Sequence, residues 1–308
     1  MPENRTCVLT ALQNVPRLGA GDMQGYQIQR LGGLTNLVYR VDTGAEQVIV
    51  RIPGEGTEEY IDRAVELYNA EVAAKAGISA EIIWADAATG VMISRCIAGI
   101  ETMTPELFAS REGSPARAGA ALAQLHGCGR EFQFRFELFA MIDEYLKILS
   151  GKEIDLPEGY NDIVRAAAPV KAALAGSPAP LAPCHCDPLC ENFLDNGTRM
   201  WIVDWEYSGM NDPMWDLGDL SVEAGFDADQ DSAMMMAYFG RAPSGAEMGR
   251  MVIYKAMCDL LWTLWGLIQH ADGNTAEDFM AYAIGRFNRC HDLMQSAAFD
   301  GHLRAISE

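Results

Sequence analysis

Positive charge is scarce in this sequence of 308 residues. It holds 23 lysine and arginine residues against 43 aspartate and glutamate residues, which gives a formal charge of −20 at pH 7. Nucleic acids and anionic membrane surfaces carry phosphate groups that such a chain would repel. We therefore exclude both as partners, whereas a cationic small molecule would be attracted.

Long hydrophobic runs without charge are also missing. The most apolar stretch, residues 251–268, is interrupted by Lys255 and Asp259, and a membrane-spanning helix needs about 20 mostly apolar residues. We expect a buried core helix there and no membrane insertion. Residues 1–4 lack the basic and apolar regions of a secretory signal, and the eight cysteines stand mostly singly. We therefore expect a reducing, cytoplasmic location.

The most specific pattern lies between His185 and Asp204. Asp187 is followed, after four residues, by Asn192, and a glycine-containing turn then leads into the apolar residues 200–203 that precede Asp204. Kinase folds use this order: one aspartate orients and deprotonates an acceptor hydroxyl, while an asparagine and a second aspartate hold Mg²⁺ on ATP. We predict phosphoryl transfer, with Asp187 as the catalytic base and Asn192 and Asp204 as metal ligands.

The turn at Asn196 and Gly197 supplies the geometry. An Asn-Gly pair favours a type I′ hairpin, so residues 200–203 should return as a strand that delivers Asp204 beside Asn192. Oxygen ligands from two segments suit Mg²⁺, which keeps room for phosphate oxygens. We expect His185 to pack the loop and not to act as a base.

Zinc is the rival interpretation of this segment. Cys184, Cys186 and Cys190 could supply thiolates. They lack the paired C-x-x-C spacing of structural zinc sites, and no second cluster follows them in the sequence. The kinase interpretation therefore ranks first.

A glycine-rich hairpin near the N-terminus predicts contacts with phosphate. Residues 26–41 read as strand, turn and strand, and residues 47–51 as a third strand. Glycines let backbone N–H groups approach phosphate oxygens. The predicted contacts are Gly32, Gly33, Thr35 and Asn36.

A kinase also needs a cation for the nucleotide phosphates. The first lysine is Lys75, well past the third strand, so Arg51 is the candidate; its planar donor fork suits phosphate oxygens. The alternative is an ordinary surface arginine. An acidic residue of the helix predicted over residues 60–75 should pair with Arg51. We favour Glu66, because Glu71 is placed to pair with Lys75 at i, i+4.

The remaining pattern predicts an α+β, protein-kinase-like fold with two lobes. Strands at 81–85 and 91–95 complete an N-terminal lobe, residues 1–97, that holds the nucleotide. Adenine should meet backbone groups from Ile93 to Arg95, and residues 96–99 read as the hinge. Helices at 114–126, 138–149, 161–174, 230–239, 247–271 and 276–296 form a helical C-terminal lobe, residues 98–308.

The run from Asp204 to Leu220, DWEYSGMNDPMWDLGDL, resembles the choline/ethanolamine kinases within the aminoglycoside phosphotransferase-like superfamily, closest to bacterial members. The likeness spans nearly the whole chain. It implies the same roles for Asp187, Asn192, Asp204 and Arg51, and a bracing role for Asp216. It also implies an acceptor pocket made of Tyr207, Glu223, Trp262, Trp265 and Tyr282. Trp205 departs from the animal enzymes, which carry phenylalanine there.

Such a pocket makes chemical sense for a cation. Aromatic faces attract a quaternary ammonium, which has no N–H to donate, and a carboxylate adds charge. Trp262 and Trp265 are three residues apart and share a helix face, although paired tryptophans on an apolar helix also serve as core. We expect a small amino alcohol as acceptor, with choline preferred over ethanolamine. The alternatives are an aminoglycoside or another small alcohol such as thiamine, and a catalytically silent nucleotide-binding protein. The oligomeric state is left open.

Overall fold

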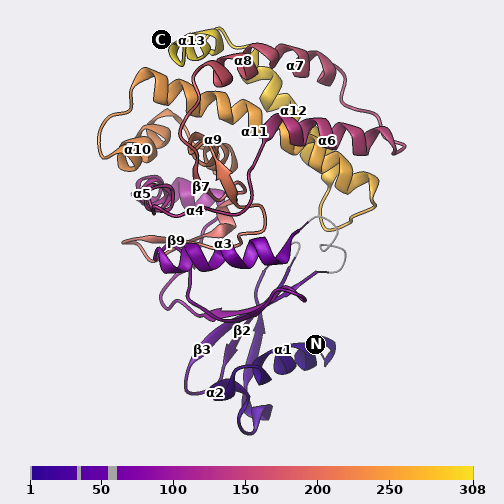
Figure 1. Ribbon diagram of the computed structural model, residues 1–308, viewed down its shortest axis with the longest axis vertical. Helices are drawn as coiled ribbons and strands as arrows, with labels where there is room; N and C mark the ends of the chain where they lie inside the picture. The colour runs from indigo at the N-terminus through magenta and orange to yellow at the C-terminus, as the bar shows by residue number, and fades with distance from the viewer. Residues whose placement is uncertain (1, 33–35, 55–60, 308) are drawn as a thin grey trace.

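The computed structural model describes residues 2–32, 36–54 and 61–307. Its N-terminal lobe is built on an antiparallel sheet (Figure 1). The strands are β1 Gln27–Arg30, β2 Asn36–Asp42, β3 Gln47–Pro53, β4 Ile82–Asp86 and β5 Val91–Arg95, in the spatial order β1-β2-β3-β5-β4. The two strands predicted within 26–41 and the three strands after them are present, whereas the turn predicted between the first two falls partly outside the described residues.

The two faces of this sheet have different partners. Helix α1 (Pro2–Gln13), α2 (Pro16–Gly19) and the short turn η1 (Met23–Gly25) precede the sheet, and α1 packs on one face. There Val8 and Leu12 join the fully buried Val48 and Val50 of β3 in one core. Because side chains alternate along a strand, Arg51 projects to the opposite face. Figure 1 shows α3 between that face and the helical lobe.

Helix α3 spans Arg63–Lys75. It begins after Asp62, whose carboxylate accepts hydrogen bonds from the backbone N–H groups of Ala64 and Val65, the usual arrangement of a helix N-cap. Gly77, at a φ of +75°, follows its end. The helix that the sequence predicts at 60–75 is therefore confirmed within the described residues, and Glu66 lies in its first turn.

The C-terminal lobe is mainly helical, as predicted. Its helices are α4 Pro105–Ser110, α5 Ser114–His126, α6 Leu138–Ser150, α7 Tyr160–Ala166, α8 Ala168–Gly176, α9 Met214–Glu223, α10 Ala228–Phe239, α11 Gly245–Ala271, α12 Phe279–Met294 and α13 Phe299–Ala305. Short strands lie between the lobes: β6 Glu101–Thr102, β8 Phe193–Asp195 and β9 Met200–Ile202 form one sheet, and β7 Ala182–Cys184 pairs with β10 Gly209–Asn211. The predicted domain boundary at 97/98 falls between β5 and β6, and it stays a prediction.

Helix α11 is the centre of this lobe. It starts with a capping box formed by Ser244 and Glu247, and it contacts α6, α9, α12 and α13. By length and composition alone it could cross a membrane, but 78% of its apolar window is buried inside the protein. The predicted core helix is confirmed.

Two local predictions need correction. The helix predicted at 161–174 is two helices, α7 and α8, because Pro169 lies at the start of α8 and a proline removes a helix hydrogen bond. The hairpin between β8 and β9 is not type I′. Its loop has four residues, and of its two central positions only Gly197 has a positive φ, because the Asn196 side chain accepts hydrogen bonds from the N–H groups of Thr198 and Arg199 instead.

Candidate active site

Asp216 holds the beginning of the catalytic loop, residues 185–192. Its two carboxylate oxygens accept hydrogen bonds from the backbone N–H groups of His185, at 2.7 Å, and Cys186, at 2.8 Å. Cys186 has a φ of +66°, which is strained for a residue with a Cβ. The Trp215 indole secures the same turn by donating to the Cys186 carbonyl at 3.0 Å. This arrangement fits the bracing role predicted for Asp216 and aims Asp187 out of the loop.

His185 links the catalytic loop to the strand end. Its Nε2 lies 2.9 Å from the carbonyl oxygen of Val203, and its ring packs edge-on against Trp205 with centroids 4.9 Å apart. Burial lowers the pKa of His185, although Asp216 pulls in the opposite direction. The ring is therefore neutral at pH 7, which agrees with a packing role.

Asn192 lies between Asp187 and Asp204. Its side-chain amide donates to the Asp187 carbonyl at 3.0 Å, and its own backbone carbonyl accepts from the N–H of Val203 at 3.0 Å. Val203 immediately precedes Asp204, whose φ is +68°. The structure thus brings the two predicted metal ligands together beside the predicted base.

A cluster of charged side chains from both lobes surrounds Asp204. Nη1 of Arg63 donates to Glu66 at 2.8 Å and to Glu206 at 2.6 Å. One carboxylate oxygen each from Glu66, Asp204 and Glu206 lies within 4.8 Å of the others. Burial, together with Glu206, raises the pKa of Asp204 to about 7, against the opposing effect of Arg51. The sequence analysis missed Arg63 and Glu206; the two-residue spacing of Glu206 from Asp204 was the available signal.

Arg51 contacts Glu66, as predicted, and Glu71 pairs with Lys75 at 2.8 Å. Nη1 of Arg51 also lies 3.3 Å from Asp204. Burial alone would lower the pKa of Arg51, but the facing carboxylates raise it above its ordinary value. Its Nε and Nη2 are buried and have no hydrogen-bond partner among the described residues. Buried donors of this kind call for a partner, and phosphate oxygens would supply one.

The other predicted nucleotide contacts are less defined. Gly33 and Thr35 lie outside the described residues. Gly32 lies between β1 and β2, with no described atom within 4 Å of the position of a Cβ, and the buried Asn36 begins β2. Ile93 lies in β5 between β3 and β4, so its backbone belongs to the sheet, and the Arg95 side chain pairs with Glu81 at 2.7 Å. Adenine contacts at Ile93 and Arg95 stay a prediction.

The predicted acceptor side chains form a continuous aromatic row. Ring centroids lie 5.8 Å apart from Tyr207 to Trp262, 6.3 Å from Trp262 to Trp265, and 5.8 Å from Trp265 to Tyr282. Trp262 is 4% exposed and its indole N–H donates to Asp219 at 3.1 Å, so it also belongs to the core. Trp265, Tyr207 and Tyr282 are partly exposed.

Asp187 interacts electrostatically with Tyr282, at the end of this row. Burial raises the pKa of Asp187 well above its ordinary value, and the carboxylates of Asp219 and Asp204 add to the shift, while Arg286 opposes it. Glu223 binds Arg286. A raised pKa makes a carboxylate a stronger base. The sequence analysis missed Asp219 and Arg286, which carry no local pattern of their own.

Ligand-type side chains also gather behind the catalytic loop. His126, Cys184 and Asp216 lie close together, and His126 is hydrogen-bonded to Asp216 at 2.9 Å and to the Tyr238 hydroxyl at 3.0 Å. Burial raises the pKa of Cys184 and of Cys186 well above its ordinary value. Neutral thiols suit packing better than zinc binding, which requires thiolates.

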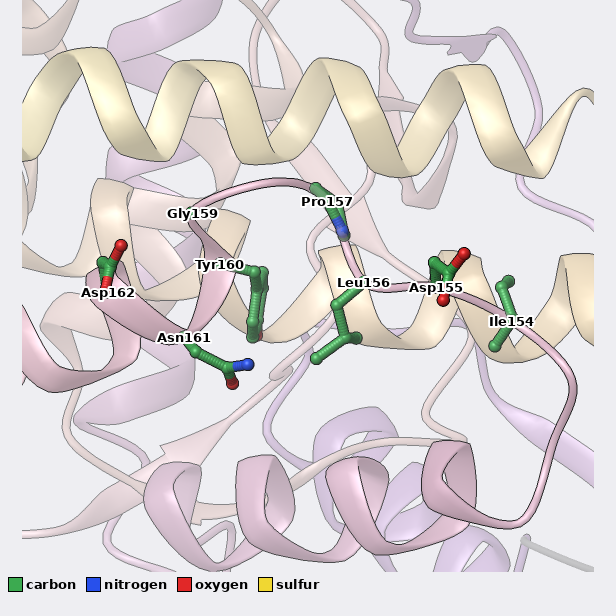
Figure 2. Close-up of a pocket in the computed structure, with 8 residues that line it drawn as sticks. All are labelled: Ile154, Asp155, Leu156, Pro157, Gly159, Tyr160, Asn161 and Asp162. Atoms are coloured by element: carbon green, nitrogen blue, oxygen red, sulfur yellow. The ribbon is translucent and has the colours of Figure 1, made fainter.

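A cavity of about 560 Å³ lies away from these residues, under the segment that joins α6 to α7. Figure 2 shows its lining, Ile154–Asp162 without Glu158, with Leu156, Tyr160 and Asn161 projecting to one side of the segment. Tyr160 is anchored by its hydroxyl, which donates to the Leu260 carbonyl at 2.7 Å. The lining comes from this one segment and contains none of the residues predicted for catalysis, metal binding or the acceptor, so we place the candidate active site at the catalytic loop.

Comparison with known proteins shows the family of this chain. The phosphotransferase enzyme family matches residues 27–251. A crystal structure of a choline/ethanolamine kinase family protein from Mesorhizobium loti is 58% identical, covers 98% of this chain and 99% of its own, and superposes with a TM-score of 0.90. The protein is a member of the choline/ethanolamine kinase family.

Two further structures are similar to this kinase. Choline kinase LicA from Streptococcus pneumoniae is 26% identical, with 94% of this chain and 98% of its own covered and a TM-score of 0.77. A structure of LicA in complex with AMP is 27% identical, with 92% and 96% covered and a TM-score of 0.72. The kinase-like fold predicted from the sequence is thus confirmed, and so is the family.

Proposed function

We propose that this kinase transfers a phosphoryl group from ATP, with Mg²⁺, to the hydroxyl of a small cationic amino alcohol, choline or ethanolamine. One observation carries the proposal: Asp187 is linked to the segment before Asp204 through Asn192, and its carboxylate interacts electrostatically with Tyr282 at the end of the aromatic row. A base flanked by a phosphate site and a cation site matches the two substrates. The similarity to choline kinase LicA, and to LicA bound to AMP, supports it.

On the nucleotide side the residues fit a metal polyphosphate. Asn192, Asp204 and Glu206 offer oxygen ligands, which Mg²⁺ prefers, and the unpartnered Nε and Nη2 of Arg51 fit phosphate oxygens. When bound, Mg²⁺ neutralises charge on the transferred phosphoryl group. Glu66 and Arg63 hold Arg51 and Glu206 in place. A kinase that uses ATP would work in the cytoplasm.

On the acceptor side, the aromatic row and Glu223 would hold the cationic group while the hydroxyl reaches Asp187. Each aromatic face contributes about 0.5–2 kcal/mol to binding a cation. Asp187 then accepts the hydroxyl proton as the acceptor oxygen bonds to the γ-phosphorus of ATP, and the bond to the β-phosphate oxygen breaks so that ADP leaves. An acceptor must place its cation at the aromatic row and its hydroxyl at Asp187 at the same time. This requirement favours amino alcohols in which a short chain separates the two groups.

An ADP-release assay with ATP and Mg²⁺ tests this function. The acceptors are choline, ethanolamine, thiamine and an aminoglycoside. We expect turnover with choline or ethanolamine and little with the other two. Turnover with the aminoglycoside or thiamine alone would assign the runner-up activity. Thermal stabilisation by ATP and Mg²⁺ with no turnover across the panel would indicate a silent nucleotide-binding protein.

A further inference from the structure

A buried guanidinium lies against the acceptor pocket. Arg286, on α12, has only 3% of its side chain exposed. Its Nη2 contacts Glu223, its Nη1 lies 3.2 Å from Asp259 and 4.0 Å from Asp219, and its Cζ stands 4.8 Å from the centre of the Tyr282 ring. Glu223 and Tyr282 are the carboxylate and the aromatic ring expected to meet the acceptor's cation. A protein cation therefore contacts both.

The neighbouring Arg289, on the same helix, shows which contacts of Arg286 are needed to pair Asp259 and which are not. It binds Asp259 through two N–H groups, Nε at 3.1 Å and Nη2 at 2.7 Å. Asp259 thus has a full partner without Arg286. Arg286, and not Arg289, contacts Asp219, Glu223 and the face of Tyr282. Of these, Glu223 and Tyr282 are the residues expected to meet the acceptor.

Arg286 does not use all of the binding capacity of Glu223 and Tyr282, so part of each side chain stays available to a ligand. Arg286 binds Oε1 of Glu223, and Oε2 accepts no hydrogen bond within the described part of the chain. Arg286 lies over Tyr282, whose ring also meets Trp265 at 5.8 Å. Within the same residues Nε of Arg286 and Oδ1 of Asp219 are buried without a hydrogen-bond partner. A guanidinium that served the fold alone would have its donors paired.

We propose that Arg286 is a positioning residue of the acceptor site: it fixes Glu223 and Tyr282 in the orientation that binds the acceptor's cation and sets the charge of the pocket. The proposal rests on the function proposed above.

Charge explains why a cation can help to bind a cation. Asp187, Asp219 and Glu223 lie on the acceptor side. Asp219 is buried, and Asp187 and Glu223 are partly buried, so without a counter-charge these carboxylates would repel one another. The fixed guanidinium of Arg286 offsets part of this repulsion and leaves an excess of negative charge that suits a single positive charge on the acceptor. The pKa of Arg286 reflects the same surroundings: burial lowers it to about 10, while Asp219 and Asp187 act to raise it.

The test compares Arg286→Met with Arg289→Met, a matched loss of an arginine from the same helix and from the same Asp259. For each protein we would measure KM for the preferred cationic acceptor, KM for ATP, and the acceptor's dissociation constant from quenching of tryptophan fluorescence without ATP. Arg286→Met should raise the acceptor KM and dissociation constant by at least about tenfold, because it frees a buried charged partner. KM for ATP should stay within about twofold, and Arg289→Met should resemble the wild type.

A double-mutant cycle with Glu223→Gln separates positioning from folding. If Arg286 acts through Glu223, Arg286→Met should cost much less acceptor affinity in the Glu223→Gln background. Arg286→Lys keeps the charge but loses the planar fork, so it should recover part of the affinity for the acceptor. If Arg286→Met does not fold, the same measurements are made on Arg286→Lys. Thermal melting of every variant accompanies the kinetics.

The outcomes distinguish the two proposals. Wild-type turnover of choline or ethanolamine with an unchanged acceptor KM in Arg286→Met or Arg286→Lys overturns the role of Arg286 and leaves the proposed function standing. A lower acceptor KM would show that Arg286 competes with the acceptor, which also overturns it, as would additive effects in the cycle. A wild-type enzyme that phosphorylates only uncharged alcohols overturns both proposals.

Discussion

At the scale of single residues, backbone strain is concentrated at the catalytic loop. Within the described chain the two non-glycine residues with positive φ are Cys186, which precedes Asp187, and Asp204. Each such conformation costs on the order of 1–3 kcal/mol and persists only where its surroundings enforce it. Asp216 and Trp215 enforce it at Cys186. The strained positions therefore coincide with the predicted metal ligand Asp204 and with the residue before the predicted base Asp187.

Asp187→Asn should lower kcat by about 10² to 10⁴-fold, because the amide cannot accept the hydroxyl proton. Binding of ATP should persist, since Asp187 acts on the acceptor. Steady-state kinetics and nucleotide titration on the same preparation check both statements. A variant with near wild-type kcat would remove Asp187 from the mechanism.

Asp204→Ala should abolish saturable, Mg²⁺-dependent binding of ATP, because the polyphosphate charge then lacks a carboxylate-held metal. Asn192→Ala should be weakened in the same direction. Glu71→Ala is the control: it removes a carboxylate from an exposed pair with Lys75 outside the cluster. Calorimetric titration with ATP at several Mg²⁺ concentrations gives the comparison, and wild-type saturation by Asp204→Ala would contradict the metal assignment.

At the scale of elements, helix crossings bring the site together. Gly218 lets α9 approach α11, since a Cβ there would lie 2.8 Å from the Met251 carbonyl oxygen. Gly266 gives Tyr282 of α12 its place against α11, where a Cβ would lie 2.7 Å from the Tyr282 ring. These two close approaches put Asp219, Trp262 and Tyr282 next to one another. The acceptor pocket is a product of helix packing.

Substituting the two tryptophans of α11 one at a time should distinguish a core role from a role in the acceptor pocket. Trp262→Ala should lower the free energy of unfolding by about 3–5 kcal/mol, because Trp262 is 4% exposed. The partly exposed Trp265→Ala should raise KM for choline by an amount equivalent to about 1–2 kcal/mol, with less effect on KM for ATP. Melting curves and both KM values decide the matter. A large stability loss without a selective acceptor defect in Trp265→Ala would remove the aromatic row from substrate binding.

The crossing of α5 and α10 should be intolerant of one methyl group. A Cβ at Gly119 would lie 2.2 Å from the Met234 carbonyl oxygen, so Gly119→Ala should lose about 1–3 kcal/mol. Gly285 of α12 has nothing within 4 Å of the Cβ position, so Gly285→Ala should gain about 0.5–1 kcal/mol from helix propensity. Urea unfolding measures both. Equal shifts for the two variants would mean that propensity, not the crossing, sets the effect.

At the scale of the whole molecule, the charge of −20 acts on the encounter with substrates. A cationic acceptor is attracted over a distance that salt shortens, to about 10 Å at 0.1 M. Contacts between the lobes hold α3 against the segment that follows Asp204: Asn69 of α3 donates to the carbonyl and hydroxyl oxygens of Ser208 at 3.0 and 3.1 Å. The attraction of a cation and the relative placement of the two lobes thus depend on the whole folded protein.

Raising the ionic strength should therefore lower kcat/KM for choline. The same change should not lower kcat/KM for ATP, whose charge has the opposite sign. Initial rates at several sodium chloride concentrations, with each substrate varied in turn, give the two curves. If kcat/KM for choline did not change with ionic strength, the net charge of the protein would not contribute to the encounter, and only contacts inside the pocket would attract the cation.

The sequence by itself determined the kinase class, the two-lobed fold, and the neighbourhood of Asp187, Asn192 and Asp204. These features follow from spacing along the chain: a short loop, a hairpin and a strand bring nearby residues together, and apolar periodicity sets helices and strands. It also separated Glu66 from Glu71, since the i, i+4 pair with Lys75 accounts for Glu71.

The tertiary structure alone decided which distant charges complete the site. Arg63 meets Glu206 across 143 residues of sequence, and Arg286 meets Glu223 across 63. No local period encodes such pairs, because they depend on how α3 and α12 pack against the catalytic lobe. The turn at Asn196 was decided in the same way, by side-chain hydrogen bonds that outweigh its dipeptide preference. Short-range order comes from chain connectivity, and long-range contacts come from packing.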